Sequence, residues 1–223
     1  MQQVDLHTHN IKNNRSIQIL NIFAQDLPVT DSEYVFSSGI HPWHIGNVNQ
    51  DECLHLIEGS AKKNNMLAIG ECGLDRSISI PIELQQTLFQ KQVRISEEYS
   101  KPIIIHCVRA FSDLLNTRKK TKSQLPWILH GYTGNKETTQ NLTRQGFYFS
   151  IGLNFLRNQS KHDILRLIPY ERLFLETDDS ELPIENIYIL AAQILNVDIE
   201  LLSEVLFNNF KRLFENGKMA TKN

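Results

Sequence analysis

The chain has 223 residues, of which 41% are hydrophobic, with a formal net charge of -2 and a pI near 6.4. This length is enough to bury one substantial core, and no linker, repeat or low-complexity run divides it, so we expect a single domain over residues 1–223. The near-neutral charge excludes the global basic field of non-specific duplex binders. Any nucleic-acid contact must therefore be local.

The three cysteines, Cys53, Cys72 and Cys107, are an odd number without C-x-x-C spacing. This pattern argues against a disulfide framework and favours a reducing compartment. The first residues do not follow the signal-peptide pattern, and no window has the apolar run of a membrane span. We therefore expect a cytoplasmic protein with no membrane partner.

Short apolar runs alternate along the chain with longer amphipathic runs, which is typical of βα units around a parallel sheet. Strands are predicted, in chain order, over residues 4–7, 16–23, 34–39, 66–70, 102–106, 127–130, 147–151 and 173–176. Helices are predicted over about 52–63, 82–99, 109–118, 135–145, 160–168, 185–195 and 199–215. Together they predict an α/β fold of the (β/α)8 TIM-barrel type, with its chemistry at the carboxyl ends of the strands.

The first two connections of this barrel, residues 8–15 and 24–33, are short for crossover helices, and the second contains Pro28. We expect a distorted barrel in which the first two helices are trimmed. The outer face of strand 16–23 would then be under-covered. A partner protein, a second copy in a homodimer or the C-terminal segment could cover it.

The first strand ends in Asp5-Leu-His7-Thr-His9. Because a strand has a period of two, His7 and His9 project to the same side, where two imidazoles can reach one metal ion. An isolated H-x-H is a weak signal, and a pair of surface histidines is the alternative interpretation.

The later strands also end in residues that can bind metal, namely Glu71, His106, His130 and Asp178, the last of which follows a second acidic residue, Glu176, by two positions. Each alone could be a solvated carboxylate or a hydrogen-bonded core histidine. Four imidazoles and two carboxylates together are about what two divalent ions need. An imidazole-rich set favours Zn or Mn over an all-oxygen Mg site.

In this order the residues resemble the TatD family of metal-dependent deoxyribonucleases and hydrolases, of which the chain would be a shortened member. The motifs D-x-H-x-H, G-x-H-P, G-E-x-G-L-D and E-T-D start at Asp5, Gly39, Gly70 and Glu176, and the strand-end histidines are His106 and His130. The resemblance implies a binuclear site in which one ion is held by His7, His9 and Asp178, the other by His106 and His130, and both by Glu71.

The resemblance also implies that Asp178 and Glu71 are catalytic, with Asp178 orienting or deprotonating the attacking water, and that His41 contacts a substrate phosphate. Asp5 and Asp75 are expected to hold ligand histidines in position. These roles belong to the family pattern and are carried to the matching positions.

The substrate rim departs from the family pattern. An aromatic pair is replaced by Arg76-Ser77, an arginine sits one position late at Arg109, and Asp179-Ser180 follows the E-T-D motif. Arg109 or Arg76 could bind phosphate through the planar guanidinium, and surface ion pairing is the alternative. Trp43 could stack on a nucleobase or pack over the barrel rim.

The leading hypothesis is a two-metal phosphodiesterase, a DNase or exonuclease acting on single-stranded DNA ends. The second is a related barrel hydrolase of esters or amides, such as an aminoacyl-tRNA deacylase, since an activated hydroxide is a general nucleophile. Many barrel hydrolases of that kind bridge their metals with a modified lysine. This chain has Glu71 at the corresponding strand end, which favours the phosphodiesterase hypothesis. The third hypothesis is a partner-dependent subunit of a larger assembly.

Overall fold

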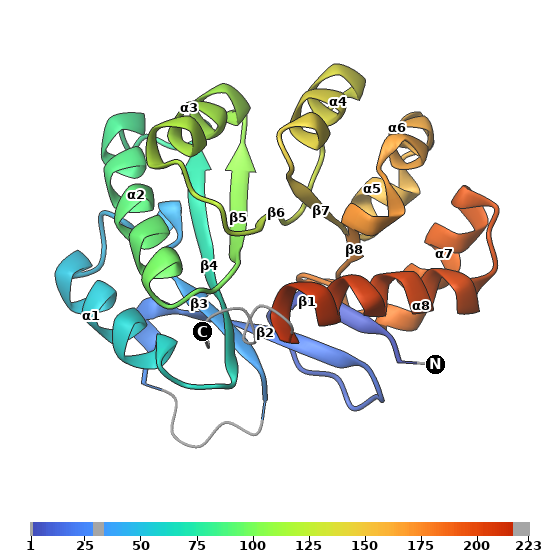
Figure 1. The fold of residues 1–223 in the computed structure, drawn as a ribbon, viewed down its shortest axis with the longest axis horizontal. Helices are drawn as coiled ribbons and strands as arrows, with labels where there is room; N and C mark the ends of the chain where they lie inside the picture. Colours follow the sequence, from blue (N-terminus) through green and yellow to red (C-terminus); the bar gives the residue numbers. More distant parts are fainter. Residues whose placement is uncertain (1, 29–33, 216–223) are drawn as a thin grey trace. The chain divides into compact units, whose positions relative to one another are not determined.

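The computed structural model describes residues 2–28 and 34–215, which form two compact units (Figure 1). The first unit contains residues up to Leu20 and those from Ile128 onward, and the second runs from Asn21 to Trp127. Each unit is described by itself.

The described residues contain eight strands, and their order in the sheet follows their order in the chain, as in a (β/α)8 barrel. Their bounds are β1 Val4–Thr8, β2 Ile17–Phe23, β3 Phe36–Gly39, β4 Met66–Asp75, β5 Ile103–Val108, β6 Trp127–Leu129, β7 Tyr148–Ile151 and β8 Leu173–Leu175. All eight were predicted. The largest difference is β4, which continues past residue 70 to Asp75 and therefore carries Glu71 within the strand.

The eight α-helices of the described chain include the seven predicted ones and the short α5, which was not predicted. Their bounds are α1 Gln50–Ala61, α2 Ile82–Glu98, α3 Phe111–Thr121, α4 Lys136–Arg144, α5 Leu153–Arg157, α6 His162–Leu167, α7 Ile184–Leu195 and α8 Ile199–Phe210. Side-chain caps start several of them: Asn49, Asn135 and Asp198 each accept a hydrogen bond from a first-turn amide.

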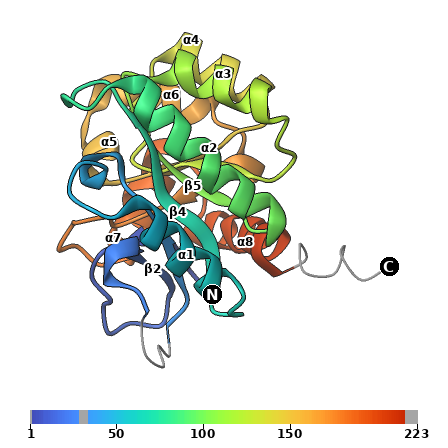
Figure 2. The same cartoon turned by 90° about the vertical axis from the view of Figure 1, so that its left-hand side faces the viewer.

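In the second unit, β3, β4 and β5 pair in parallel, with Ser38 opposite Ile69 and Gly73 opposite His106. Figure 2 shows α2 in front of β4, the strand on which it packs. This helix buries a face that includes Leu88 and Ile95, whereas Leu84, which the apolar spacing of the sequence places on the same face, is 42% exposed.

In the first unit, β6, β7 and β8 are parallel, and β1 pairs with β2. An isolated bridge between Thr8 and Asp178 joins the ends of β1 and β8. Helix α8 packs on β1 and β8. The carboxyl ends of β1 and β8 therefore meet, which brings the first and last predicted site motifs together.

The first two connections carry no α-helix within the described residues 9–16, 24–28 and 34–35, as predicted; only a 3-10 turn, Ala24–Asp26, follows β2. In place of a helix, the side chain of Gln18 accepts a hydrogen bond from the amide of Lys12 and donates one to its carbonyl, at 2.8 Å each. Residues 29–33 and the end of the C-terminal segment, 216–223, lie outside the described part. Coverage of β2 by a partner, a second copy or that segment stays a prediction.

Within residues 2–28 and 34–215, no helix combines the length and the apolar character that crossing a bilayer requires. The cytoplasmic location stays a prediction.

Candidate metal centre

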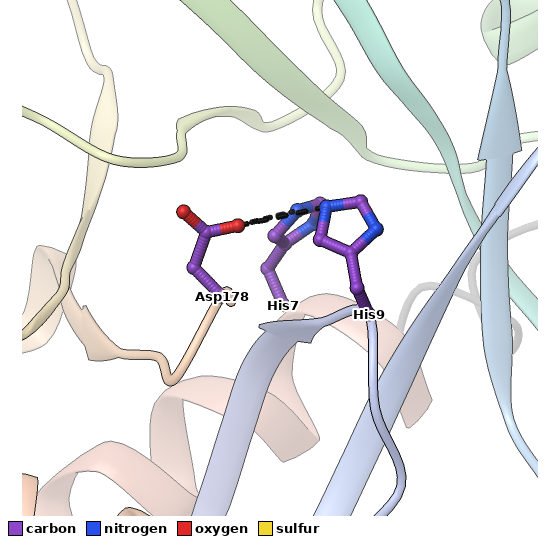
Figure 3. A group of neighbouring side chains, drawn as sticks. All are labelled: His7, His9 and Asp178. Atoms are coloured by element: carbon purple, nitrogen blue, oxygen red, sulfur yellow. Dashed lines mark ion pairs between the residues drawn. The ribbon is translucent and has the colours of Figure 1, made fainter. Parts of the chain in front are cut away.

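The first unit brings His7, His9 and Asp178 into one cluster (Figure 3). Oδ1 of Asp178 lies 3.7 Å from Nε2 of His7 and 3.5 Å from Nε2 of His9. The His7 side chain is fully buried, whereas that of His9 is 21% exposed and that of Asp178 is 40% exposed. The cluster therefore has a buried floor and an open side.

Main-chain hydrogen bonds hold the three residues in place. The amide of Asp178 donates to the carbonyl of His7 at 2.9 Å, and the amide of His9 donates to the carbonyl of Asp178 at 3.3 Å. Asp178 has a positive φ of 54°, a conformation that aspartate tolerates better than most residues. This turn at the end of β8 aims its carboxylate at the two histidines.

Asp5 is buried below this cluster, and its hydrogen bonds go to Thr177. Its Oδ1 accepts from the Thr177 amide at 2.8 Å, and its Oδ2 accepts from the Thr177 hydroxyl at 2.6 Å. Burial raises the pKa of Asp5 to about 7, although the Thr177 hydrogen bonds oppose the shift. Asp5 thus fixes the residue preceding Asp178. That it also holds a ligand histidine in position stays a prediction.

Glu176 and Asp178, two residues apart at the end of β8, have separate environments. Glu176 is fully buried; its Oε1 lies 3.2 Å from Nδ1 of His130 and accepts a hydrogen bond from the Gly131 amide at 2.6 Å. A histidine that donates from Nδ1 presents the lone pair of Nε2. The rings of His130 and His7 are 4.0 Å apart, so His130 lies beside the cluster.

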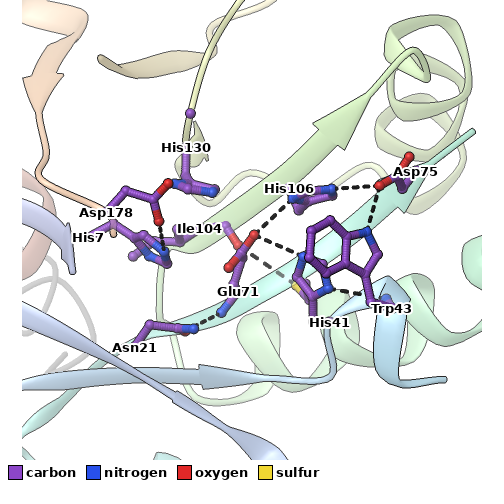
Figure 4. Close-up of polar contacts among 12 residues, drawn as sticks. His7, Asn21, His41, Trp43, Glu71, Asp75, Ile104, His106, His130 and Asp178 are labelled. Atoms are coloured by element: carbon purple, nitrogen blue, oxygen red, sulfur yellow. Dashed lines mark hydrogen bonds and ion pairs between the residues drawn. The ribbon is translucent and has the colours of Figure 1, made fainter. Parts of the chain in front are cut away.

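The second unit forms its own cluster of His41, Glu71 and His106 (Figure 4). Oε1 of Glu71 lies 3.1 Å from Nε2 of His41 and 2.9 Å from Nδ1 of His106. The amide of Glu71 donates to the side chain of Asn21 at 2.9 Å. The buried carboxylate of Glu71 therefore lies between two imidazoles, and the hydrogen bond to Asn21 holds the backbone of β4 in place at Glu71.

His41 is held as a hydrogen-bond donor. Its Nδ1 accepts from the amide of Trp43 at 3.1 Å, and burial lowers its pKa, which favours the neutral ring. An amide nitrogen can only donate, so the proton of the neutral ring is on Nε2, which donates to Glu71. Ligation of an ion through Nε2 would place a proton on Nδ1 against the Trp43 amide. His41 therefore suits a donor better than a metal ligand.

His106 lies between two carboxylates. Its Nε2 is 3.1 Å from Oδ2 of Asp75, while its Nδ1 faces Glu71. Burial opposes ionisation of Asp75, but hydrogen bonds from Ser77, Trp43 and His106 outweigh it and lower its pKa to about 2. A neutral imidazole has one N–H, so a cation on the Glu71 side would satisfy the other nitrogen while Asp75 holds the ring. Asp75 thus contacts the histidine it was expected to position.

Glycine permits the close strand approach that places Glu71 beside His106. A Cβ added to Gly73, whose φ is 149°, would lie 2.0 Å from the carbonyl oxygen of His106.

We expect Gly73→Ala to lower the free energy of unfolding by about 2 kcal/mol or more, from overpacking and backbone strain together. Gly59→Ala, where a Cβ would meet nothing within 4 Å, should stabilise α1 slightly. Urea unfolding of both variants checks this; equal midpoints would contradict it.

Two buried glutamines on the apolar face of α2 hold the ends of β3 and β4. Gln92 accepts a hydrogen bond from the amide of Ile40 at 2.7 Å and donates to its carbonyl at 3.2 Å. Gln85 pairs with the backbone of Asp75 in the same way, at 2.7 and 2.9 Å. Sequence reasoning missed both. Their signal was a pair of polar residues seven positions apart on an otherwise apolar face.

We expect Gln92→Leu to cost about 1–3 kcal/mol of stability, because it leaves the backbone groups of Ile40 buried without a partner. It should also weaken any activity, since Ile40 precedes His41. Gln90→Leu, on the same helix but outside this contact, is the matched control. Thermal unfolding and activity measured on both variants test the role; an equal effect of the two substitutions would refute it.

The two candidate phosphate-binding arginines differ. Arg76 forms a bidentate ion pair with Asp113, with N–O distances of 2.6 and 2.8 Å, so surface ion pairing is confirmed for it. Arg109 is exposed, with a φ of 52°, on the turn after β5. Its role as a phosphate contact stays a prediction.

A family model described as TatD related DNase matches residues 4–215. The 3′-5′ ssDNA/RNA exonuclease TatD of Citrobacter koseri is 35% identical over 148 residues, which cover 64% of this chain and 56% of that protein. The uncharacterized metal-dependent hydrolase YcfH of Escherichia coli K12 is 30% identical over 210 residues, which cover 86% of this chain and 78% of that protein. The matched segment thus spans little more than half of the first relative.

Solved structures agree on the fold. The TatD homologue YJJV from Escherichia coli K12 superposes with a TM-score of 0.82 at 20% identity and covers 95% of this chain and 97% of its own. A TatD family hydrolase from Entamoeba histolytica gives a TM-score of 0.78 at 17% identity, over 96% and 98% of the two chains. This likeness confirms the fold class that the sequence predicts.

Proposed function

We propose, since this chain belongs to the family of TatD-related DNases, that it is a metal-dependent hydrolase that cleaves phosphodiester bonds at the ends of single-stranded DNA. The observation that carries the proposal is the presence, in each unit, of a histidine–carboxylate cluster on the strands or shortly after them: His7, His9 and Asp178 in one, Glu71 and His106 in the other. The exonuclease name of the Citrobacter relative supports the same substrate class.

The donor set fits divalent metal ions. Two ligands of a tetrahedral ion at about 2.1 Å are about 3.4 Å apart. Oδ1 of Asp178 lies 3.5 and 3.7 Å from the two histidine nitrogens, close to that separation and longer than a usual hydrogen bond. Imidazole-rich clusters favour Zn or Mn over Mg. We propose one ion at each cluster; bridging by Glu71 and ligation by His130 stay predictions.

An ion held at these residues would supply Lewis-acid activation of the phosphoryl group and of water. Asp178 combines a fixed backbone with a partly exposed carboxylate, so it is placed to accept a proton from the attacking water. His41 holds its Nε2 proton toward Glu71 and can turn that donor to a phosphate oxygen. Glu176 keeps His130 in one orientation.

A cavity beside Asp178 offers room for a nucleotide in the first unit. Its volume is about 390 Å³, and its lining includes Tyr132, Asn154 and Phe155 from the connections after β6 and β7. Sites for small molecules have comparable volumes and combine apolar walls with a few polar groups. A terminal nucleotide suits this cavity better than an intact duplex, whose paired bases cannot enter it.

The experiment that tests the proposal combines metal analysis with hydrolysis of end-labelled single-stranded DNA, with and without Mn, Mg and Zn. We expect about two ions per chain, the number the clusters can hold, and stepwise release that starts from the 3′ end, as in the relative's name. Bound metal without cleavage of DNA or RNA would refute the nuclease and leave the metal site standing.

A further inference from the structure

Trp43 is an exposed aromatic residue whose position is fixed. It lies on the 3-10 turn Pro42–His44 directly after His41, and its side chain is 57% exposed. A single exposed hydrophobic residue needs no functional explanation by itself. Trp43 differs from such a residue because its indole N–H donates a hydrogen bond to a neighbouring side chain, while a large part of its surface stays exposed to solvent.

Three contacts fix the indole. Its Nε1 donates to Oδ2 of Asp75 at 2.8 Å (Figure 4). Its ring packs edge-to-face on the ring of His41, with the ring centroids 4.9 Å apart and an angle of 83° between the ring planes. It packs in the same way on the ring of His106, with a centroid distance of 5.8 Å and an interplanar angle of 74°. A side chain already held in one geometry loses little conformational entropy when a ligand covers it. The ring is therefore prepared as a rigid binding surface.

The contacts also place this surface at the proposed metal cluster. Asp75 accepts from Trp43 and from His106 through the same oxygen, Oδ2, and His106 contacts Glu71. A nucleotide whose phosphate contacted His41 would carry its base within reach of the indole, since the two rings are in contact. All these residues belong to the second unit, so the geometry holds within one compact body.

We propose that Trp43 is a stacking platform for a nucleobase, and that it makes the enzyme select unpaired nucleotides next to the cleaved bond. This rests on the proposed function and adds a specificity-determining residue to it. Every base has a π-face, so stacking is tolerant of sequence. It requires a base that is not already stacked in a duplex. The indole thus favours single strands without a basic groove, which suits a chain of net charge -2.

The test uses the metal-loaded protein and non-cleavable phosphorothioate oligonucleotides in which one abasic residue is moved along the chain. Binding is measured by fluorescence polarisation of the labelled oligonucleotide and by tryptophan emission. The protein has two tryptophans, and Trp127 is fully buried, so a stacked base should quench mainly Trp43. We expect the abasic residue to weaken wild-type binding by about 5- to 150-fold at one position, the effect of losing one stacked base.

Two variants separate stacking from the hydrogen bond to Asp75. Trp43→Phe and Trp43→Leu both lose the indole N–H, but only phenylalanine keeps an aromatic face. Trp43→Phe should retain most of the discrimination against the abasic position, and Trp43→Leu should lose it. Tyr34→Leu, which removes another exposed aromatic residue, 50% exposed, is the control and should discriminate as the wild type does.

Equal discrimination by Trp43→Leu and the wild type would overturn the stacking role, as would unchanged tryptophan emission at saturation. Cleavage of ordinary oligonucleotides by the wild type, run in parallel, tells this failure from failure of the proposed function. Cleavage by a protein whose binding does not depend on the position of the abasic residue refutes only the stacking role of Trp43. Neither binding nor cleavage of any oligonucleotide refutes both.

Discussion

Asp178→Asn is expected to lower the rate of DNA hydrolysis by roughly 10²- to 10⁴-fold, the usual contribution of a general base. Asparagine keeps the size of the side chain and tolerates the positive φ of 54° at this position, so the fold should survive. What it removes is the negative charge that faces His7 and His9 and the ability to accept a proton. Release of label from single-stranded DNA, measured at saturating Mn, gives the rate.

The matched control for this substitution is Asp51→Asn, at a carboxylate that is 90% exposed and belongs to neither cluster. This variant should cleave at the wild-type rate. Circular dichroism and thermal unfolding establish that both proteins are folded. If folded Asp178→Asn keeps full activity at every metal concentration, Asp178 is neither ligand nor base, and the proposed mechanism fails at its first step.

Glu71→Gln is expected to abolish both hydrolysis and the stabilisation that metal gives. In the wild type, an ion at 100 times its dissociation constant should stabilise the fold by about 2.7 kcal/mol, which corresponds to roughly 5–10 °C in Tm. The variant should gain little at the same concentration, because a neutral amide is a poor ligand. Without metal, its Tm should be no lower than that of the wild type, since no buried charge has to be desolvated.

Differential scanning calorimetry over a titration of Mn or Zn measures this effect independently of activity. Glu204→Gln, on the exposed side of α8, is the control and should show the wild-type shift. An unchanged metal-induced shift in Glu71→Gln would remove Glu71 from the ligand set. Loss of the shift with full retention of cleavage would instead separate the stabilising ion from the reaction.

The strands and the identity of the candidate ligands could be predicted from the sequence because both depend on local pattern. Apolar runs bounded by glycine and polar residues mark the strands, and in a parallel sheet the residue after each run lies at the same edge. His7, His106 and His130 all follow this rule, and in the structure each lies in the carboxyl-terminal half of its strand or directly after it. The short connection before β2 likewise left too few residues for a helix.

The division of roles between Glu176 and Asp178 could not be predicted in this way. Both follow β8, two residues apart, and alternation alone would place them on the same side. A positive φ at Asp178 turns its carboxylate to His7 and His9, while Glu176 stays buried under His130 and Gly131. This conformation depends on hydrogen bonds between the end of β1 and the segment after β8, such as that of Thr8 with Asp178, 170 residues away in the chain.

By itself, then, the sequence determined which residue types stand at the strand ends, since burial and a period of two are local properties. Only the tertiary structure decided what each of them touches. Arg76 pairs with Asp113, Gln92 holds the backbone before His41, and the Trp43 amide sets the proton on that histidine. Contacts between distant elements depend on strand register and helix packing. A one-residue shift in either would leave the local pattern intact and give every side chain a different partner.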